Sequence, residues 1–294
     1  IGHIAIDEAH CVSEWGDSFR PAYLTLGNII SVLKVPVVTA FTATASPEVL
    51  SRVSEVLFEG RAHILRSESD RPNIHYYVER AECKQKAALF CAVREEKPLI
   101  VFCSTRKRTE KTAKNFREFF GKDTVKFYHA GLSKEEKEDV EKWFYPKKDA
   151  VLVATCAFGM GVDKKDIKTV IHLDPPPTAE AYIQEAGRGG RDGSTAKALL
   201  IWSAQDDYKA ESYKDGSRAK ALYKFASSET CRRQELLDAL GAEQAFCTGC
   251  DICEGIRQEY AEDERIILDF IQHHRKQYTR EEACMHLLKI FNKK

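Results

Sequence analysis

Short runs of hydrophobic residues alternate along most of the chain with longer stretches in which hydrophobic and polar residues mix. The short runs have the unbroken apolar character of buried strands, and the stretches between them have the pattern of covering helices. Buried strands that are separated by helices pair in parallel, so the pattern predicts an α/β fold with parallel sheets. The predicted strands are residues 4–6, 35–41, 99–103, 125–128, 151–155, 170–173 and 199–202.

Two changes in this pattern predict domain boundaries. The polar segment 67–73 (SESDRPN) separates two blocks of predicted strands, and its proline disfavours helix, which is typical of an interdomain linker. Beyond the last predicted strand, residues 204–257 are polar, helical in pattern and end in a cluster of cysteines. Thr279 and Glu282 fit a capping box at the start of a helix. Two further helices are therefore predicted, at 262–274 and 279–290.

Composition and charge narrow the class of protein. With 294 residues, of which 43% are hydrophobic, the chain is long enough to form two compact domains. No apolar run approaches the roughly 20 residues that a membrane span needs, and the N-terminus lacks the features of a signal peptide. We therefore expect an intracellular protein without a membrane partner. Because the formal net charge is zero, any affinity for DNA must come from local basic surfaces.

Four of the ten cysteines form a cluster with the spacing C-x15-C-x2-C-x2-C, whereas the other six are scattered, mostly in apolar stretches that are typical of reduced core positions. Four thiolates in an intracellular chain favour a structural, tetrahedral Zn²⁺ site. Disulfides are the alternative in a secreted protein. An iron–sulfur cluster is a second alternative, although ferredoxins add a further Cys followed by Pro, which this segment lacks. The predicted ligands are Cys231, Cys247, Cys250 and Cys253.

Two adjacent carboxylates, Asp7 and Glu8, follow the first predicted strand. In phosphoryl transfer one carboxylate can hold Mg²⁺ and the next can orient the attacking water, while a solvated acidic strand end is the alternative. The catalytic crevice of parallel α/β folds lies at the carboxyl ends of the strands. Because this chemistry comes so early, we expect the chain to begin inside a domain, with a segment missing upstream.

A polar loop rich in aromatic residues follows, with the sequence CVSEWGDSFRPAY. Bases stack on aromatic faces and arginine binds phosphate, so this loop is a candidate contact with DNA. A place in the core is the alternative for the tryptophan. The candidate residues are Trp15, Phe19 and Arg20.

The second block of strands carries two candidate phosphate-binding segments. In CAFGMGVD, Gly159 and Gly161 let the backbone approach a nucleotide closely, and Asp163 can accept a hydrogen bond from a sugar hydroxyl, although an ordinary turn is the alternative. The segment TAEAYIQEAGRGGRDG predicts a helix that is capped by its first residue. A spacing of four and three residues predicts that Gln184, Arg188 and Arg191 share one face of that helix, where two arginines suit a triphosphate. A salt-bridged surface helix is the alternative, which the four glycines in this segment oppose.

Taken in order, the segments DEAH, CVSEWGDSFRPAY, AFTATAS, IVFCSTR, FYHAGL, VATCAFGMGVDK and YIQEAGRGGRDG resemble the motif series of the RecQ family of superfamily 2 DNA helicases, over residues 1 to about 257. The resemblance implies 3′ to 5′ unwinding of DNA driven by ATP, with Mg²⁺, and a structural Zn²⁺. It implies single-stranded and forked DNA as partners, and a role in DNA repair and recombination. The implied domains are the C-terminal part of a first RecA-like lobe at 1–66, a second RecA-like lobe at 67–203, a zinc-binding module at 204–257 and the start of a winged helix at 258–294.

The same resemblance implies roles for individual residues. Asp7 and Glu8 would act on Mg²⁺ and water, and His10 would couple the ATP site to the DNA loop. Arg188 and Arg191 would address the γ-phosphate, with Gln184 beside them. The residues implied to lie along the phosphates of the bound strand are Ser104, Arg106, His129 and Thr155.

The sequence departs from the family pattern in two places. Asp17 and Ser18 stand where the family usually has a His-Asp pair, and no GxxxxGK[ST] phosphate loop occurs in the 294 residues. We therefore expect a helicase that lacks its ATP-binding N-terminal segment and hydrolyses ATP very slowly or not at all. A DEAH-box RNA helicase and a non-catalytic DNA-binding or regulatory fragment are the alternatives. The resemblance further implies a monomer in the cytoplasm or nucleoid of a bacterium or the nucleus of a eukaryote, with single-stranded-DNA-binding protein or repair factors as partners.

Overall fold

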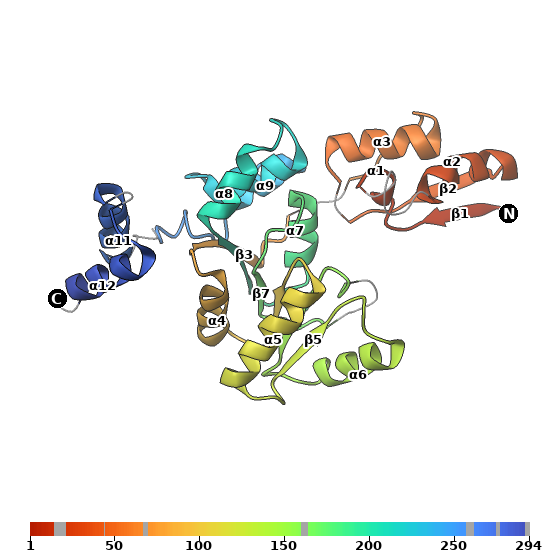
Figure 1. Cartoon of the computed structure of the whole chain (residues 1–294). Helices are drawn as coiled ribbons and strands as arrows, with labels where there is room; N and C mark the ends of the chain where they lie inside the picture. The colour runs from red at the N-terminus through yellow and green to blue at the C-terminus, as the bar shows by residue number, and fades with distance from the viewer. Residues whose placement is uncertain are drawn as a thin grey trace. The chain divides into compact units, whose positions relative to one another are not determined.

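The structure, a computed structural model, divides the chain into two compact units, Ile1–Glu254 and Gly255–Lys294, which are described separately below (Figure 1). Among the described residues, no helix is both long enough and apolar enough to cross a membrane. The residues that the structure describes are 1–14, 22–43, 45–66, 70–159, 164–256, 262–274 and 277–291.

The first unit begins with two parallel strands, β1 (His3–Ile6) and β2 (Val37–Ala40). Helix α3 (Pro47–Phe58) repeats apolar residues at intervals of four, which puts Val49, Val53 and Leu57 on one buried face. These side chains form one core with residues of β1 and α1. The other helices of this part are α1 (Cys11–Glu14) and α2 (Ala22–Leu33).

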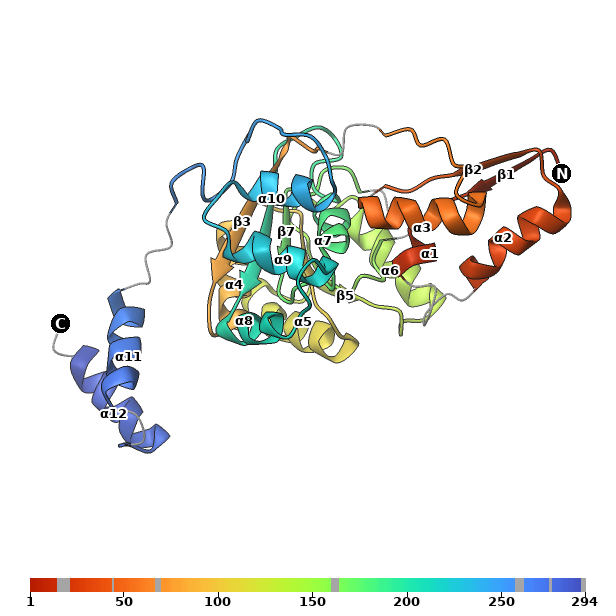
Figure 2. The same ribbon diagram turned by 90° about the horizontal axis from the view of Figure 1, so that it is seen from above.

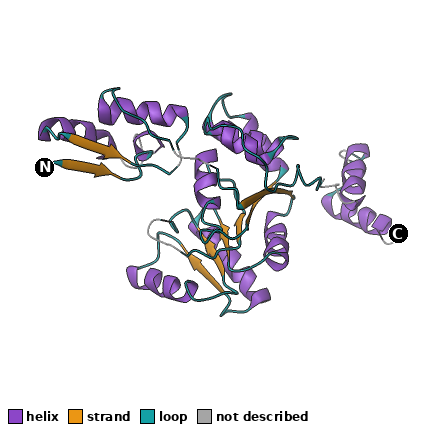
Figure 3. Ribbon diagram, turned by 180° about the vertical axis from the view of Figure 1, so that it is seen from behind, coloured by secondary structure: helices purple, strands orange, loops and turns teal. Residues whose placement is uncertain are grey.

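In the part of the chain that the structure describes, six further strands form one parallel sheet in the order β3-β8-β7-β4-β6-β5. Every residue of β4, β6 and β7 is buried, because helices cover both faces of the sheet (Figure 3). The covering helices are α4 (Lys84–Arg94), α5 (Arg106–Phe120), α6 (Lys134–Phe144) and α7 (Ala179–Ala186). The strands are β3 (Ile74–Arg80), β4 (Leu99–Phe102), β5 (Val125–Tyr128), β6 (Val151–Ala154), β7 (Thr169–His172) and β8 (Ala196–Trp202).

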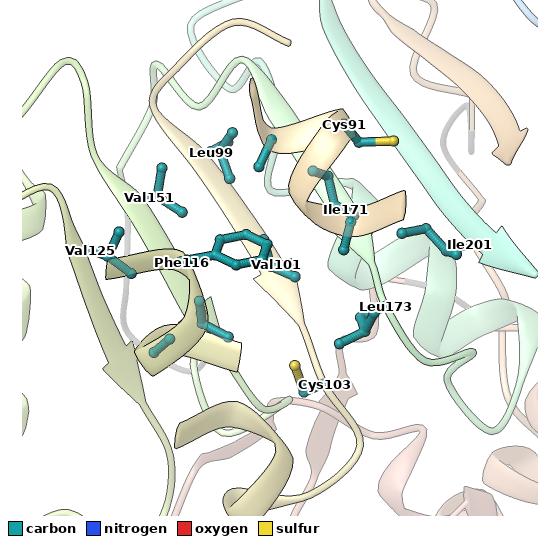
Figure 4. Close-up of a cluster of buried hydrophobic side chains, with 14 of the residues drawn as sticks. Cys91, Leu99, Val101, Cys103, Phe116, Val125, Val151, Ile171, Leu173 and Ile201 are labelled. Atoms are coloured by element: carbon teal, nitrogen blue, oxygen red, sulfur yellow. The ribbon is translucent and has the colours of Figure 1, made fainter. Parts of the chain in front are cut away.

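Alternate residues of β4 belong to two different cores, because successive side chains of a strand point to opposite faces. Leu99 and Val101 pack with α4 and α5, where Phe116 lies over the sheet (Figure 4). Ile100 and Phe102 pack on the other face with residues of α6. The unbroken apolar runs of the sequence therefore correspond to strands that are buried on both faces, and the predicted parallel α/β fold is confirmed.

The strand β3 was not predicted from the sequence. Its side chains alternate between buried and half-buried, and it lies at the edge of the sheet, so it lacks the continuous apolar run of the central strands. Residues 249–251 cover its outer edge, where the amide of Tyr76 donates to the carbonyl of Gly249 (3.2 Å) and the amide of Asp251 donates to the carbonyl of Tyr76 (3.3 Å). This pairing satisfies backbone groups that an edge strand would otherwise expose.

The segment after the sheet, residues 204–254, is here called the cysteine module. Its helices pack on the face of the sheet that carries α7, and both α9 and α10 contact α7 (Figure 2). Tyr76, Tyr182 and Phe225 lie in one buried cluster that also contains Leu236 and Cys250. The module therefore shares its core with the sheet. Its helices are α8 (Ala204–Glu211), α9 (Arg218–Ser227) and α10 (Arg232–Ala239).

The second unit contains α11 (Glu262–His273) and α12 (Arg280–Phe291), which confirms the two helices predicted there. The predicted capping box is also confirmed. The amide of Thr279 donates to Glu282 Oε2 (2.8 Å), and the amide of Glu282 donates to Thr279 Oγ1 (3.3 Å).

Two phenylalanines of α5 test this account of the core. Phe116 is 1% exposed and Phe119 is 61% exposed. We expect Phe116→Ala to lower the free energy of unfolding by about 3 to 5 kcal/mol, because it removes transfer energy and leaves a cavity. The matched variant Phe119→Ala should cost about 1 kcal/mol at most. Denaturant unfolding followed by circular dichroism measures both, and equal losses would contradict the assigned packing.

Candidate functional site

Several predicted site residues can now be located, but five lie outside the described residues. They are Trp15, Phe19 and Arg20 of the aromatic-rich loop, and Gly161 and Asp163 of the glycine segment.

The DEAH segment leaves the carboxyl end of β1 in a strained turn. Glu8 has a φ of 52°, which is uncommon for a residue other than glycine, and its amide donates to Asp7 Oδ1 (2.8 Å). His10 is buried, with Nδ1 3.3 Å from Glu8 Oε2 and 3.2 Å from Thr42 Oγ1. Since β1 and β2 are neighbours, the histidine joins the acidic segment to the residues that follow β2. Strain of this kind is typical of functional sites.

The large sheet gathers a second set of polar residues at one edge. Ser104 follows β4, Thr155 follows β6 and His129 follows β5, and these strands are adjacent and parallel in the order β4-β6-β5. Parallel strands end at the same edge, so the structure brings these predicted residues together. Ser104 is exposed, whereas Thr155 and His129 are largely buried.

The ring of His129 is held from both sides. The amide of Gly131 donates to Nδ1 (3.2 Å), so Nδ1 is an acceptor and the proton of the neutral ring is on Nε2, which faces Glu110 Oε1 at 2.9 Å. A Cβ added at Gly131 would lie 3.2 Å from His129 Nδ1 and 3.2 Å from Arg106 Nη1. Arg106 and His129 therefore lie together against this glycine.

Asp174, which the sequence analysis missed, organises the same edge. It follows the strand β7, and its Oδ2 accepts from the Ser104 amide (3.0 Å) and from Ser104 Oγ (2.9 Å). The same oxygen lies 3.0 Å from Arg108 Nε. Its signal in the sequence is an acidic residue directly after a predicted strand, which is also the signal of Asp7.

Gly159 and Arg188 are in direct contact. Arg188 Nη1 donates to the carbonyl of Gly159 (3.0 Å), and a Cβ added at Gly159 would lie 2.2 Å from Arg188 Nη2. Burial lowers the pKa of the Arg188 guanidinium, and the positive charge of Arg191 lowers it further. Glu185 and Glu8 act in the opposite direction. The site therefore holds a desolvated arginine directly against the backbone of Gly159, where a Cβ would displace the guanidinium.

The prediction that Gln184, Arg188 and Arg191 share a helical face is wrong. Helix α7 ends at Ala186, so only Gln184 lies on it, and the two arginines belong to the following turn. We call residues 187–193 the arginine turn. Its four glycines lower the helix propensity, and Gly190 has a φ of +58°, which leaves the helical region.

The four clustered cysteines meet as predicted. Their Sγ atoms all lie within 4.8 Å of one another, compared with the roughly 3.8 Å between ligands that Zn–S bonds of about 2.3 Å imply for a tetrahedron. None of the four is joined in a disulfide in this structure. Burial acts to raise the pKa of Cys231, but amide donors at the start of α10 and the neighbouring thiols lower it overall. Four thiols in this arrangement fit a structural metal site.

A buried ion pair joins the two segments that carry these cysteines. Arg232 Nε lies 3.0 Å from Asp251 Oδ1, and Arg232 Nη2 lies 3.3 Å from Asp251 Oδ2. Asp251 also accepts from the amide of Val78 in β3 (3.2 Å). The cluster is thus fixed both to α10 and to the edge of the sheet.

The sequence of the chain is similar to those of known helicases. The family model for the helicase conserved C-terminal domain matches residues 83–193. The ATP-dependent DNA helicase RecQ of Pasteurella multocida is 35% identical over 273 residues, which is 88% of this chain and 43% of that protein. RecQ of Bacillus subtilis is 30% identical over 86% of this chain and 45% of its own length. The chain belongs to the RecQ family of helicases. It spans less than half the length of these RecQ relatives.

Solved structures agree with this RecQ assignment at the level of the fold. Dbp5 of S. cerevisiae, bound to RNA and ADP BeF3, has a TM-score of 0.59 at 15% identity over 87% of this chain and 61% of that chain. Mss116p, bound to ssRNA and AMP-PNP, has a TM-score of 0.57 at 17% identity over 94% of this chain and 55% of that chain. These identities are too low to carry function, so they support only the RecA-like helicase fold.

Proposed function

We propose that this RecQ-family chain forms part of a motor that unwinds DNA in the 3′ to 5′ direction and is driven by ATP hydrolysis. The observation that carries the proposal is the convergence of motif residues at the carboxyl edge of the large sheet. There Ser104, His129 and Thr155 follow adjacent strands, and Gly159 contacts Arg188 beside them. A polar edge with one buried arginine suits a phosphate backbone next to a nucleotide.

The nucleotide side of the proposal uses residues of both sheets. Asp7 would hold Mg²⁺ and Glu8 would orient the attacking water, while His10 connects Glu8 to Thr42. Arg188 would neutralise charge on the γ-phosphate, with Arg191 near it. Bound Mg²⁺ would supply charge neutralisation at the phosphates. Positioning and electrostatics are nearly all of the catalysis in this class of reaction, so these residues account for the proposed chemistry.

The DNA side of the proposal uses the exposed part of the same edge. Ser104 and Arg106 are exposed there, and Asp174 fixes Ser104 through two hydrogen bonds. His129 and Thr155 are largely buried, so we propose that they hold the exposed DNA-contacting residues in place from below and do not lie over the bound DNA strand. The aromatic-rich loop remains a predicted contact with DNA. The roles in repair and recombination and the protein partners that the resemblance implies also remain predictions.

We further propose that Cys231, Cys247, Cys250 and Cys253 hold one structural Zn²⁺. The supporting observations are the close approach of four free thiols and the buried Arg232 pair beside them. Zinc accepts such a set of four sulfur ligands without an open position, and its binding would contribute directly to folding of the module.

The zinc proposal predicts that elemental analysis finds one zinc and no iron per chain. Cys250→Ser should remove the metal and raise amide hydrogen exchange in residues 204–254, because the free energy of metal binding contributes to the folding of this segment. The exposed Cys284 lies outside the cluster, so Cys284→Ser is the matched control and should retain the metal. A brown protein with visible absorption would instead support an iron–sulfur cluster.

The motor proposal predicts very slow ATP hydrolysis by these 294 residues alone, because they contain no GxxxxGK[ST] segment to hold the β- and γ-phosphates. A fusion that places the phosphate-loop segment of a RecQ relative before residue 1 should release phosphate in a DNA-stimulated reaction. Glu8→Gln should abolish that reaction, because it removes the carboxylate that orients water. Rapid turnover by the 294 residues, lost on Glu8→Gln, would contradict the need for the phosphate loop, and an inactive fusion would favour a non-catalytic DNA-binding role.

A further inference from the structure

The arginine turn is held by two side chains from the segment just before β3. Arg71 Nη1 donates to the carbonyl of Gly187 (3.3 Å), and Arg71 Nη2 donates to the carbonyls of Gly189 (3.2 Å) and Gly190 (3.2 Å). Asn73 Nδ2 donates to the carbonyl of Gly190 as well (2.8 Å). These carbonyls follow the end of α7, where backbone acceptors lack helical partners and a cation is favoured. Arg71 and Asn73 therefore fix the backbone that carries the two arginines.

The fit around Gly190 leaves the turn little freedom. A Cβ at Gly190 would lie 2.3 Å from the carbonyl oxygen of Ser194 and 2.5 Å from Asn73 Nδ2. Asn73 also donates to the carbonyl of Ser194 (2.8 Å) and accepts from the amide of Ala196 (2.9 Å). A displacement of residues 70–73 would therefore move the turn as well.

The same segment is held from its other side by the cysteine module. Arg233 of α10 is fully buried, and its Nη1 donates to the carbonyl of Arg71 (3.0 Å) and pairs with Asp70. Its Nη2 donates to Thr248 Oγ1 (2.6 Å), and Thr248 in turn donates to the carbonyl of Pro72. A buried guanidinium with this many acceptors is strongly held, because an unpaired charge there would be costly.

The two side chains of the cysteine module that bind residues 70–73, Arg233 and Thr248, lie close in sequence to cysteines of the cluster. Arg233 lies two residues after Cys231, and Thr248 directly follows Cys247. The path from the cysteine cluster to the arginine turn thus consists of Arg233 and Thr248, then residues 70–73, and then the glycine carbonyls of the turn. Every step is a hydrogen bond or a covalent bond.

We propose that the cysteine module positions the arginine turn. In this proposal Arg71 and Arg233 are the positioning residues, and through them a displacement of the module reaches the turn. The proposal deepens, and in its consequence for ATP hydrolysis rests on, the proposed role of Arg188 and Arg191. Loosening of the module would shift residues 70–73, release the glycine carbonyls and leave the two arginines poorly placed. The segment that the sequence predicts to be a linker is in this account the connection between a structural metal site and the catalytic arginines.

Hydrogen exchange of residues 187–193 tests the coupling without any need for activity. Arg71→Ala should raise exchange in the turn about tenfold or more, because it removes charged hydrogen bonds to three carbonyls. The matched control is Arg80→Ala, since Arg80 lies at the opposite end of β3, about 23 Å from Asn73 at 3.3 Å per residue. Arg80 pairs with Asp207 of α8 (3.0 Å), so Arg80→Ala removes one arginine ion pair at the end of β3 that is farthest from residues 70–73, and exchange in the turn should not change.

A change within the module provides the decisive comparison. Thr248→Val keeps the shape of the side chain but removes the hydroxyl, so it should raise exchange in residues 187–193 as well as locally, whereas Thr248→Ser should keep the turn protected. If Thr248→Val loosens only the cysteine loop, or Arg71→Ala leaves the turn unchanged, the proposed coupling is wrong.

Kinetics separate this inference from the proposed function. In the ATP-hydrolysing fusion described above, Arg71→Ala should lower kcat about tenfold or more with little change in KM for ATP. The reason is that misplaced arginines stabilise the charge on the γ-phosphate less well in the transition state, whereas binding of ATP in the ground state changes little. Arg71→Lys, which keeps a donor, should recover part of the rate. If the turn loosens but kcat does not change, the coupling stands and the role of Arg188 and Arg191 in hydrolysis is contradicted.

Discussion

Strands β7, β4, β6 and β5 pair in parallel, so the residues that follow them leave the sheet at one edge. The register is shared across these strands, since Val151 is opposite Leu99 on one side and Val125 on the other. Helices cover both faces, and a slip of one residue would turn core side chains of β4 to the wrong face. This packing is the constraint that brings Ser104, Thr155 and His129 together, although they are far apart in sequence.

A second constraint is the set of buried arginines at the junction of the sheet and the cysteine module. Arg232 pairs with Asp251, and Arg233 is surrounded by acceptors from residues 70–74 and from Thr248. Removing one member of a buried pair typically costs about 3 to 5 kcal/mol, because the other charge stays desolvated. The module and the edge strand β3 therefore depend on each other, and the arginine turn depends on both.

Much of this fold could be predicted from the sequence, because buried parallel strands produce continuous apolar runs and the start of α12 carries a local capping signal. The strand β3 could not, since its alternating pattern is completed by residues 249–251 from far along the chain. The end of α7 at Ala186 could not either, because its spacing fits a longer helix and the carbonyls of the turn are held by Arg71. Asp174 has a recognisable position after a strand, but its two partners become visible only in three dimensions.

The central claim, that the carboxyl edge of the large sheet binds a nucleic-acid backbone, is tested most directly by the salt dependence of binding to single-stranded DNA. Fluorescence anisotropy should give modest affinity that falls steeply with salt, because phosphate contacts release counterions. Arg106→Ala should weaken binding and lower the slope of log Kd against log salt by about one. Lys142, near the end of α6 and toward the opposite edge of the sheet, provides the control, and Lys142→Ala should leave both quantities unchanged. Equal affinity at low and high salt, or equal effects of the two substitutions, would contradict the account.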